Sequence, residues 1–149
     1  MAPTLPELQE LLPDSSVDLG GQVPSREEAI RRVGGLLVRS GAAQPGYVEH
    51  MLEREASVST FVGDGVAMPH GTVTDDSEVL RDALSVLVLA EPIDWAGESV
   101  SVVIGIAAHG RGYIALLSQL ASELLREGQV TELRAANTPS AVRALLAGD

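Results

Sequence analysis

Two nearly continuous apolar runs in the second half of the chain constrain its fold most strongly. They are ALSVLVLAE at 83–91 and SVSVVIGIAA at 99–108, and both are rich in valine. β-Branched residues favour strands, and a strand without alternating polar residues is typical of a sheet that is buried on both faces. The segment PIDWAGE between them is predicted to be a turn. We therefore expect a central sheet with helices on both faces.

The flanking segments have the spacing and end signals of helices. Ser25 is the predicted N-cap of the clearest helix, with Glu28 three residues later as in a capping box, and Gly41 is its stop. The Gly34–Gly35 pair costs helix propensity and therefore indicates a close packing contact. Further helices are expected at 45–56, at 112–128, at 129–137, and from Pro139, after a cap at Thr138, to a stop at Gly148.

Weaker signals complete the predicted organisation. SSVDLG at 15–20 is a weak strand candidate, and two short extended pieces flank a turn at Gly63–Gly65. Residues 1–14 contain three prolines and are expected to form a loosely attached arm of a single domain, 1–149. The helix at 112–128 is expected to bury Leu117, Leu120, Ala121 and Leu124.

Composition limits the classes of function. The chain has 149 residues, a formal net charge of −11, no cysteine and only three, widely spaced histidines. The charge disfavours nucleic acid and anionic membranes as partners, because their phosphates would be repelled. Neither a metal site nor another cofactor is expected. With no apolar run of about 18 residues and no signal-peptide pattern, the prediction is a cytoplasmic protein without direct membrane insertion.

The segment GDGVAMPHGTV at 63–73 contains the strongest candidate for chemistry. Pro69 restricts the backbone before His70, Gly71 after it permits close approach of another molecule, and Thr72 supplies a hydroxyl near the ring or a bound anion. A neutral imidazole is a competent nucleophile that can attack phosphorus and hold the group as a phosphoramidate. On position alone, a partly buried histidine bonded to the backbone explains His70 equally well.

The same region resembles a known family. LEREASVSTFVGDGVAMPHGT at 52–72 is similar to the active-site segment of the enzyme IIA domains of the bacterial sugar phosphotransferase system, above all the mannitol type of the mannitol/fructose class. The segment at 25–56, VIGIAAHGRG and the closing LLAG follow the family in order, so the resemblance covers about residues 15–148. It implies a mixed sheet between helical layers, which is an α+β fold arranged as an α/β/α three-layer sandwich.

The resemblance also implies roles for two residues. His70 takes the position of the histidine that receives a phosphoryl group from the phosphocarrier protein HPr and passes it to a IIB domain, which phosphorylates the incoming sugar. Arg54 corresponds to the family's arginine, whose guanidinium could bind two phosphoryl oxygens at once. Without the resemblance, a solvated arginine paired with Glu53 or Glu55 is the simpler explanation.

The loop after GIAA departs from the family pattern. Members of the mannitol branch carry a second histidine there, whereas an ungapped alignment places Gly112 and Tyr113 at that position. Tyr113 could donate a hydrogen bond to a phosphoryl oxygen, or His109, four residues earlier, could turn inwards and substitute. The alternatives are a Tyr113 packed in the core and a His109 on the surface. Because the loop leads into a helix N-terminus, its backbone amides also suit an anion.

The sequence therefore predicts a phosphotransferase component that moves a phosphoryl group from HPr through His70 to a IIB domain, with mannitol the expected sugar. No IIB or membrane segment follows LLAGD, so we expect IIB on a separate chain, or the sequence to be an excised domain. The alternative is a regulatory module of the nitrogen type, whose phosphorylation state controls a transporter or a transcription regulator. A hydrolase with His70 as base comes last, because no serine or aspartate motif supports it.

Overall fold

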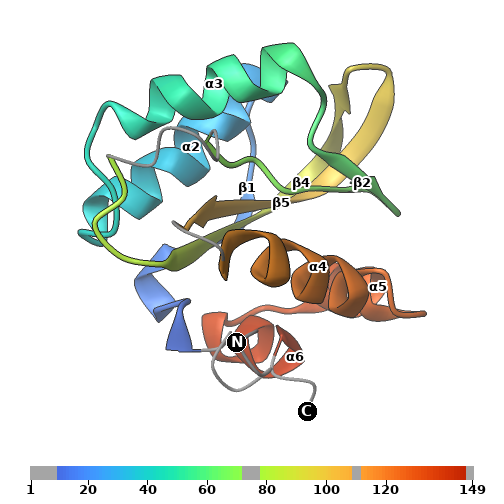
Figure 1. Ribbon diagram of the computed structural model, residues 1–149. Coiled ribbons are helices and arrows are strands. Elements are labelled where there is room, and N and C mark those ends of the chain that lie inside the picture. Colours follow the sequence, from blue (N-terminus) through green and yellow to red (C-terminus); the bar gives the residue numbers. More distant parts are fainter. Residues whose placement is uncertain (1–9, 72–77, 109–111, 147–149) are drawn as a thin grey trace.

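A five-stranded mixed sheet forms the centre of the molecule. The computed structural model describes residues 10–71, 78–108 and 112–146 (Figure 1). The strands, in the spatial order β1-β4-β5-β3-β2, are β1 (Val17–Gly21), β4 (Ala83–Trp95), β5 (Glu98–Ala107), β3 (Val66–Ala67) and β2 (Phe61–Gly63). β1 is parallel to β4 and β3 to β5, whereas β4–β5 and β2–β3 are antiparallel. The mixed sheet implied by the family resemblance is confirmed.

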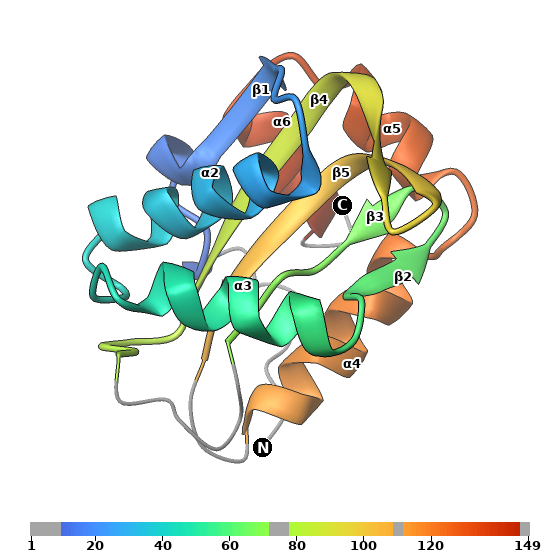
Figure 2. The same cartoon turned by 90° about the horizontal axis from the view of Figure 1, so that it is seen from above.

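Helices cover both faces of this sheet, as predicted (Figures 1 and 2). One face carries α2 (Arg26–Arg39) and α3 (Tyr47–Ser57). The other carries α4 (Gly112–Leu124), α5 (Gln129–Ala135) and α6 (Pro139–Leu146), and a short 3-10 helix, η1 (Asp14–Ser16), precedes β1. The three-layer arrangement is therefore an α+β fold with one apolar cluster on each side of the sheet.

The long apolar runs are strands buried on both faces. Val102, Ile104 and Ile106 of β5 pack in the cluster shared with α4, α5 and α6. Val103 and Ala107 belong to the cluster shared with α2 and α3. Successive side chains of a strand point to opposite faces, so a strand between two helical layers needs apolar residues at every position.

The β4–β5 hairpin is longer than the sequence predicted. PIDWAGE is not a turn throughout, because pairing continues to Trp95 opposite Glu98 and only Ala96 and Gly97 connect the strands. Both connecting residues have positive φ, 53° and 92°, which suits the tight two-residue turn of a hairpin. The extension has a physical reason in Trp95, which is fully buried and donates its indole N–H to Glu55 at 3.0 Å.

The first helix begins and packs as predicted. Ser25 Oγ accepts a hydrogen bond from the Glu28 backbone N–H at 3.2 Å, which is the N-cap interaction. A Cβ at Gly34 would lie 3.0 Å from Val48 Cγ2, so this glycine marks the contact between α2 and α3. A Cβ at Gly35 would meet nothing within 4 Å, and the close contact therefore needs only the first glycine of the pair.

The buried face of α4 differs from the prediction. Leu116, Leu120 and Leu124 are the buried residues, whereas Leu117 and Ala121 are only partly buried beside them. The physical reason is that Leu117 and Ala121 pack against the edge of this cluster and also line a hollow, which leaves them partly open. Helical spacing predicted the correct side of the helix, but the middle of the buried face lies about one residue closer to the N-terminus than predicted.

The described part of the predicted N-terminal arm is held against the sheet. Leu12 is fully buried, and the Leu11 carbonyl accepts a hydrogen bond from Leu84 N–H at 2.9 Å. Loose attachment is therefore wrong for these residues, and 1–9 lie outside the described residues. At the other end, Thr138 Oγ1 accepts from Ala141 N–H at 3.2 Å, which confirms the cap, and Gly148 lies outside the described residues.

Gly105 of β5 provides a test of the packing between the sheet and α2. A Cβ at Gly105 would overlap Ser85 Oγ and lie 2.8 Å from Val33 Cβ. Gly105→Ala should therefore lower the free energy of unfolding by about 1–3 kcal/mol. Gly35→Ala is the matched control, because alanine there meets no neighbour and favours the helix by about 1 kcal/mol. Urea unfolding measures both, and equal stability of the two variants would contradict the packing described here.

Candidate functional site

His70 follows the short strand β3 and lies beside the central strand β5. β3 runs parallel to β5, and the pairing continues as a single bridge between His70 and Ile106. Ile106 N–H donates to the Pro69 carbonyl at 3.0 Å, so the chain is attached to the central strand directly before the histidine. His70 is only 6% exposed. The site is therefore built against a buried strand.

One ring nitrogen of His70 is bonded to the backbone. Nδ1 lies 2.8 Å from the carbonyl oxygen of Met68. A carbonyl oxygen only accepts hydrogen bonds, so Nδ1 carries a proton, and in the neutral ring the lone pair is then on Nε2. The backbone contact expected for a structural histidine is thus present, and it also selects the tautomer in which Nε2 can act as a nucleophile.

The surroundings keep the His70 ring neutral. Burial lowers the pKa of His70 below its ordinary value of 6.5, because the charged ring loses its hydration. The positive charge of Arg54 lowers this pKa further, whereas the hydrogen bond to Met68 and the negative charge of Glu55 raise it. The net direction is downward, so the neutral form of the His70 ring predominates at pH 7.

A hollow of about 300 Å³ lies beside His70. Its described walls come from the end of α3, from the segment leading into β2 and from α4. Of the described residues that line it, only Arg54 and His70 can carry a charge. The remaining lining residues are Ser59, Thr60, Phe61, Val62, Met68, Leu117, Ser118 and Ala121. The hollow therefore combines a neutral imidazole and a guanidinium with a largely apolar wall.

Arg54 reaches this hollow from the last turn of α3. Its Nη1 donates to the Val58 carbonyl at 2.8 Å. Within the described ranges it makes no ion pair with Glu53 or Glu55, so the simpler explanation from the sequence does not hold. A guanidinium has five N–H donors, and one bond to Val58 leaves capacity for an anion. Of the predicted residues, the structure brings Arg54 and His70 together.

Glu55 forms a buried network beside Arg54 that was not predicted from the sequence. The residue is 4% exposed, and its carboxylate accepts hydrogen bonds from Thr60 N–H at 2.9 Å, from Trp95 Nε1–H at 3.0 Å and from the Thr60 hydroxyl. Arg26 Nη1 lies 3.9 Å from the same carboxylate. Hydrogen bonds and a nearby cation satisfy a charge that would otherwise be costly to bury. The network holds the end of α3, from which Arg54 projects.

Gly71 contacts a residue of its own chain rather than leaving space for another molecule. Its N–H donates to the Tyr47 hydroxyl at 2.9 Å, and a Cβ at this position would lie 2.5 Å from Tyr47 Cε1. The sequence predicted neither Tyr47 nor Glu55 as a residue of the site. The available signal was helical spacing, because Tyr47, Met51 and Glu55 recur every four residues and are the buried residues of α3.

For three other residues, the predicted contact with a phosphoryl group stays a prediction. Thr72 and His109 lie outside the described residues. Tyr113 belongs to the first turn of α4 by its backbone, and its side chain is likewise outside the described part of the chain. α4 does lie beside the site, since Leu117 and Ala121 line the same hollow as His70.

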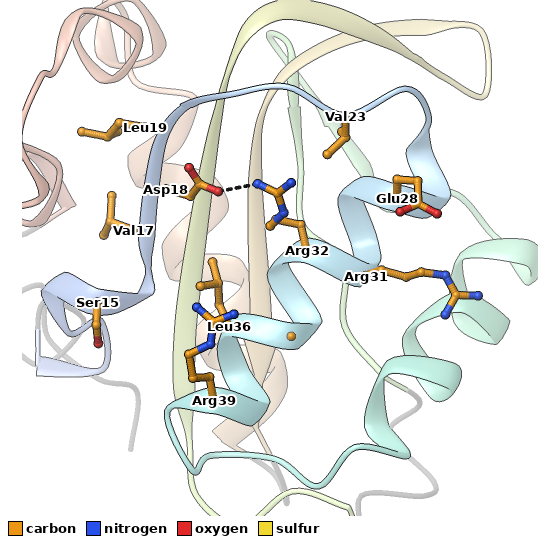
Figure 3. Close-up of a pocket in the computed structure, with 11 residues that line it drawn as sticks. Ser15, Val17, Asp18, Leu19, Val23, Glu28, Arg31, Arg32, Leu36 and Arg39 are labelled. Atoms are coloured by element: carbon orange, nitrogen blue, oxygen red, sulfur yellow. Dashed lines mark hydrogen bonds and ion pairs between the residues drawn. The ribbon is translucent and has the colours of Figure 1, made fainter.

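A larger hollow lies between β1 and α2, and none of the described residues that line it also lines the hollow beside His70 (Figure 3). It has a volume of about 580 Å³. Arg32 of α2 bonds there to Asp18 of β1 at 2.7 Å, as Figure 3 shows. Arg31 bonds to Glu49 of α3 at 3.3 Å. Arg31 and Arg32 are thus compensated within the chain, and no histidine is among the described residues that line this hollow. We therefore place the chemistry in the smaller hollow. Among the described residues, no group of three or more His, Asp or Glu side chains could hold a metal ion.

The fold and the site together define a class of protein, the phosphotransferase components. A mixed sheet between two helical layers presents a neutral histidine beside an arginine, in a hollow that an anionic group could enter. The chain belongs to the family described as phosphoenolpyruvate-dependent sugar phosphotransferase system, EIIA 2, whose model matches residues 10–148. The family resemblance seen in the sequence is thereby confirmed.

Individual relatives agree with this assignment. The mannitol-specific phosphotransferase enzyme IIA component of Halalkalibacterium halodurans is 38% identical over 138 residues, which are 93% of this chain and 95% of that protein. The complex of enzyme IIA mannitol and phosphorylated enzyme IIB mannitol from Escherichia coli contains a chain with 32% identity and a TM-score of 0.85, covering 93% of this chain and 100% of that one. The nitrogen regulatory protein IIA-Ntr from Neisseria meningitidis has 26% identity and a TM-score of 0.82, with coverage of 94% and 99%.

The helices of the described ranges are all too short or too polar to cross a membrane.

Because Arg54 and Glu55 carry opposite charges beside His70, removing one or the other should shift the pKa of His70 in opposite directions. Glu55→Gln removes the negative charge that raises the pKa of His70, so this pKa should fall further. Arg54→Gln removes the positive charge that lowers it, so the pKa should rise toward 6.5. Glutamine can retain the hydrogen bonds of Glu55, because its amide oxygen accepts and its NH₂ can donate to the Thr60 hydroxyl. NMR titration of the histidine ring signals measures both shifts.

Glu49→Gln is the control for this titration, since Glu49 is an exposed glutamate of the same helix that pairs with Arg31. It should leave the pKa of His70 unchanged. Shifts of the same sign in the Glu55 and Arg54 variants would show that the two charges do not act on His70 as described.

Proposed function

We propose that the chain carries a phosphoryl group on Nε2 of His70, accepts it from phosphorylated HPr and passes it to a IIB domain. The observation that supports this most directly is the hydrogen bond from Nδ1–H of His70 to the Met68 carbonyl at 2.8 Å. It leaves the lone pair of a buried, neutral imidazole on Nε2. A neutral imidazole with a defined tautomer is a suitable nucleophile for phosphorus.

The chemistry of each step follows from this arrangement. In loading, the Nε2 lone pair attacks phosphorus, and the bond from phosphorus to the donor atom of HPr breaks with its electron pair returning to HPr. Positive charge develops on the His70 ring as the new bond forms. Met68 O, which accepts from Nδ1–H, and the negative Glu55 both stabilise that charge. In transfer to IIB, the acceptor attacks phosphorus and the electron pair of the Nε2–P bond returns to Nε2.

Arg54 has a double role in the proposed reaction. Before transfer, its charge helps to keep His70 neutral. During transfer, its guanidinium binds phosphoryl oxygens, which carry negative charge into a protein whose formal net charge is already −11. Thr72 and Tyr113 are proposed to donate further hydrogen bonds to these oxygens, with His109 as the alternative to Tyr113.

Mannitol is the proposed sugar, and a IIB domain of a mannitol permease is the proposed acceptor. The 38% identical relative from Halalkalibacterium halodurans is named mannitol-specific, and the 32% identical Escherichia coli chain occurs in a complex with phosphorylated IIB mannitol. The nitrogen regulatory relative has a nearly equal TM-score but only 26% identity, so identity rather than fold favours the mannitol type. We place the protein in the cytoplasm, because phosphoenolpyruvate, named in the family description, is a cytoplasmic metabolite.

Loss of the imidazole should abolish loading without loss of the fold. His70→Ala should accept no labelled phosphate from phosphorylated HPr, whereas His50→Gln, a change in the middle of α3, should be loaded normally. The label on the unmutated protein should be acid-labile and base-stable, and NMR should place it on Nε2. A chase with IIB of a mannitol permease should remove it. Loading of His70→Ala would exclude His70, and loading without transfer to any IIB would favour the regulatory alternative.

Arg54 should matter more for transfer than for stability. A charge-assisted hydrogen bond contributes about 1.5–3 kcal/mol, so Arg54→Ala should slow loading by about 10- to 150-fold. Arg54→Lys keeps the charge but loses the planar fork, and its rate should be intermediate. Arg39→Ala makes the same change in charge at an exposed position of α2 and should leave the rate unaltered. Rapid-quench measurement with labelled HPr compares the loading rates of these variants. An unchanged rate in Arg54→Ala would show that Arg54 is a simple surface charge.

A further inference from the structure

Both peptide planes that flank His70 are attached to one residue of β5. The plane before His70 is held directly, because Ile106 N–H donates to the Pro69 carbonyl at 3.0 Å. The plane after it contains the N–H of Gly71, which donates to the Tyr47 hydroxyl at 2.9 Å. That hydroxyl donates in turn to the Ile106 carbonyl at 2.8 Å. Ile106 is therefore the common anchor, and Tyr47 completes the second attachment.

The Tyr47 side chain has little freedom in this position. The residue is 1% exposed and belongs to the apolar cluster between the sheet and the layer of α2 and α3. A phenol has a single proton, and the bond to the Ile106 carbonyl uses it, so the oxygen meets Gly71 as an acceptor. The ring packs against the backbone after His70 so closely that a Cβ at Gly71 would lie 2.5 Å from Cε1.

Two fixed peptide planes determine where the His70 side chain points. Each peptide unit is planar, so holding the units on both sides of a residue fixes its φ and ψ and with them the direction of its Cα–Cβ bond. The hydrogen bond from Nδ1–H to the Met68 carbonyl then restricts rotation of the ring. These three attachments together set the direction of Nε2.

We propose that Tyr47 is a positioning residue for phosphoryl transfer at His70, whose hydroxyl holds Nε2 in line for attack by bridging Gly71 and Ile106. This inference rests on the proposed function of His70. Displacement at phosphorus requires the attacking and leaving atoms to be nearly in line, and a misplacement of about 1 Å can cost about 100-fold in rate. Tyr47 acts through backbone groups, so it positions the nucleophile rather than taking part in the bond changes.

Tyr47→Phe tests this inference, because it keeps the ring and removes the hydroxyl. At saturating phosphorylated HPr, the rate of loading should fall by about 10- to 100-fold. The KM for HPr should change by less than about twofold, since the loss concerns the alignment of Nε2 and not the binding of the donor. Circular dichroism and thermal unfolding establish that the variant is folded at the temperature of the assay.

A second readout does not depend on transfer. In ¹⁵N NMR spectra of the unphosphorylated protein labelled at histidine, His70 should show a protonated Nδ1 and an unprotonated Nε2 at pH 8. Tyr47→Phe should give a mixture of both tautomers. Gly71→Ala should do the same, because the added Cβ displaces the Tyr47 ring. Should Tyr47→Phe not fold, the glycine variant provides the test by itself.

Ser85→Ala is the matched control. The Ser85 hydroxyl is fully buried and donates to the Val33 carbonyl at 2.8 Å, which joins β4 to α2 in the same layer. Its removal also deletes a buried hydroxyl-to-carbonyl bond, but one that does not hold the segment carrying His70. Loading should stay within about twofold of the unmutated rate, and the tautomer should not change. Equal slowing in Ser85→Ala and Tyr47→Phe would overturn the inference, because general loosening would explain both.

The outcomes separate this inference from the proposed function. If the unmutated protein accepts no phosphate, the proposed function is wrong. The tautomer measurement still tests whether Tyr47 fixes the orientation of the His70 ring. If the unmutated protein is loaded and Tyr47→Phe is loaded at the same rate with a single Nδ1–H tautomer, the positioning role is wrong.

Discussion

The pairing of β5 with its neighbours is the interaction on which both the core and the site depend. β5 lies in the middle of the sheet, and its side chains enter the apolar clusters on both faces. Its backbone pairs with β3 and with the His70 segment at the same time. One strand can serve both purposes because side chains point to the faces of a sheet, whereas N–H and C=O groups point to the adjacent strands. Core stability and site geometry are therefore set by the same ten residues.

The proposed reaction makes two opposite electrostatic demands on the His70 imidazole. Before the phosphoryl group arrives the ring must be neutral, and burial together with Arg54 keeps its pKa low. While the ring carries the phosphoryl group it is positively charged, and the Met68 carbonyl and Glu55 would then stabilise it. Arg54 and Glu55 are adjacent in sequence, but one lines the hollow and the other lies in a buried network. One turn of α3 thus supplies both signs of charge without pairing them with each other.

Local sequence signals predicted the parts of the structure that local interactions decide. The cap at Ser25, the long buried strands and the two short strands flanking Gly63–Gly65 belong to this group. The unpredicted contacts join residues far apart in sequence: Glu55 with Trp95, 40 residues away, and Tyr47 with Ile106, 59 residues away. Helical spacing can mark a residue as buried, but it cannot identify the backbone group that a buried hydroxyl will meet. The role proposed for Arg54 follows from the family resemblance, since its position in the sequence alone favoured a surface ion pair.

The long sequence separation of these contacts has a consequence for synthesis of the chain. Tyr47, Glu55 and His70 leave the ribosome well before Trp95 and Ile106, and contacts between distant residues form only after the intervening chain has closed. Neither peptide plane beside His70 is therefore anchored to β5 until the β4–β5 hairpin is complete. Under the proposed function, the imidazole acquires the geometry for phosphoryl transfer in the same event that closes the core, so an unfinished chain would accept the phosphoryl group only slowly.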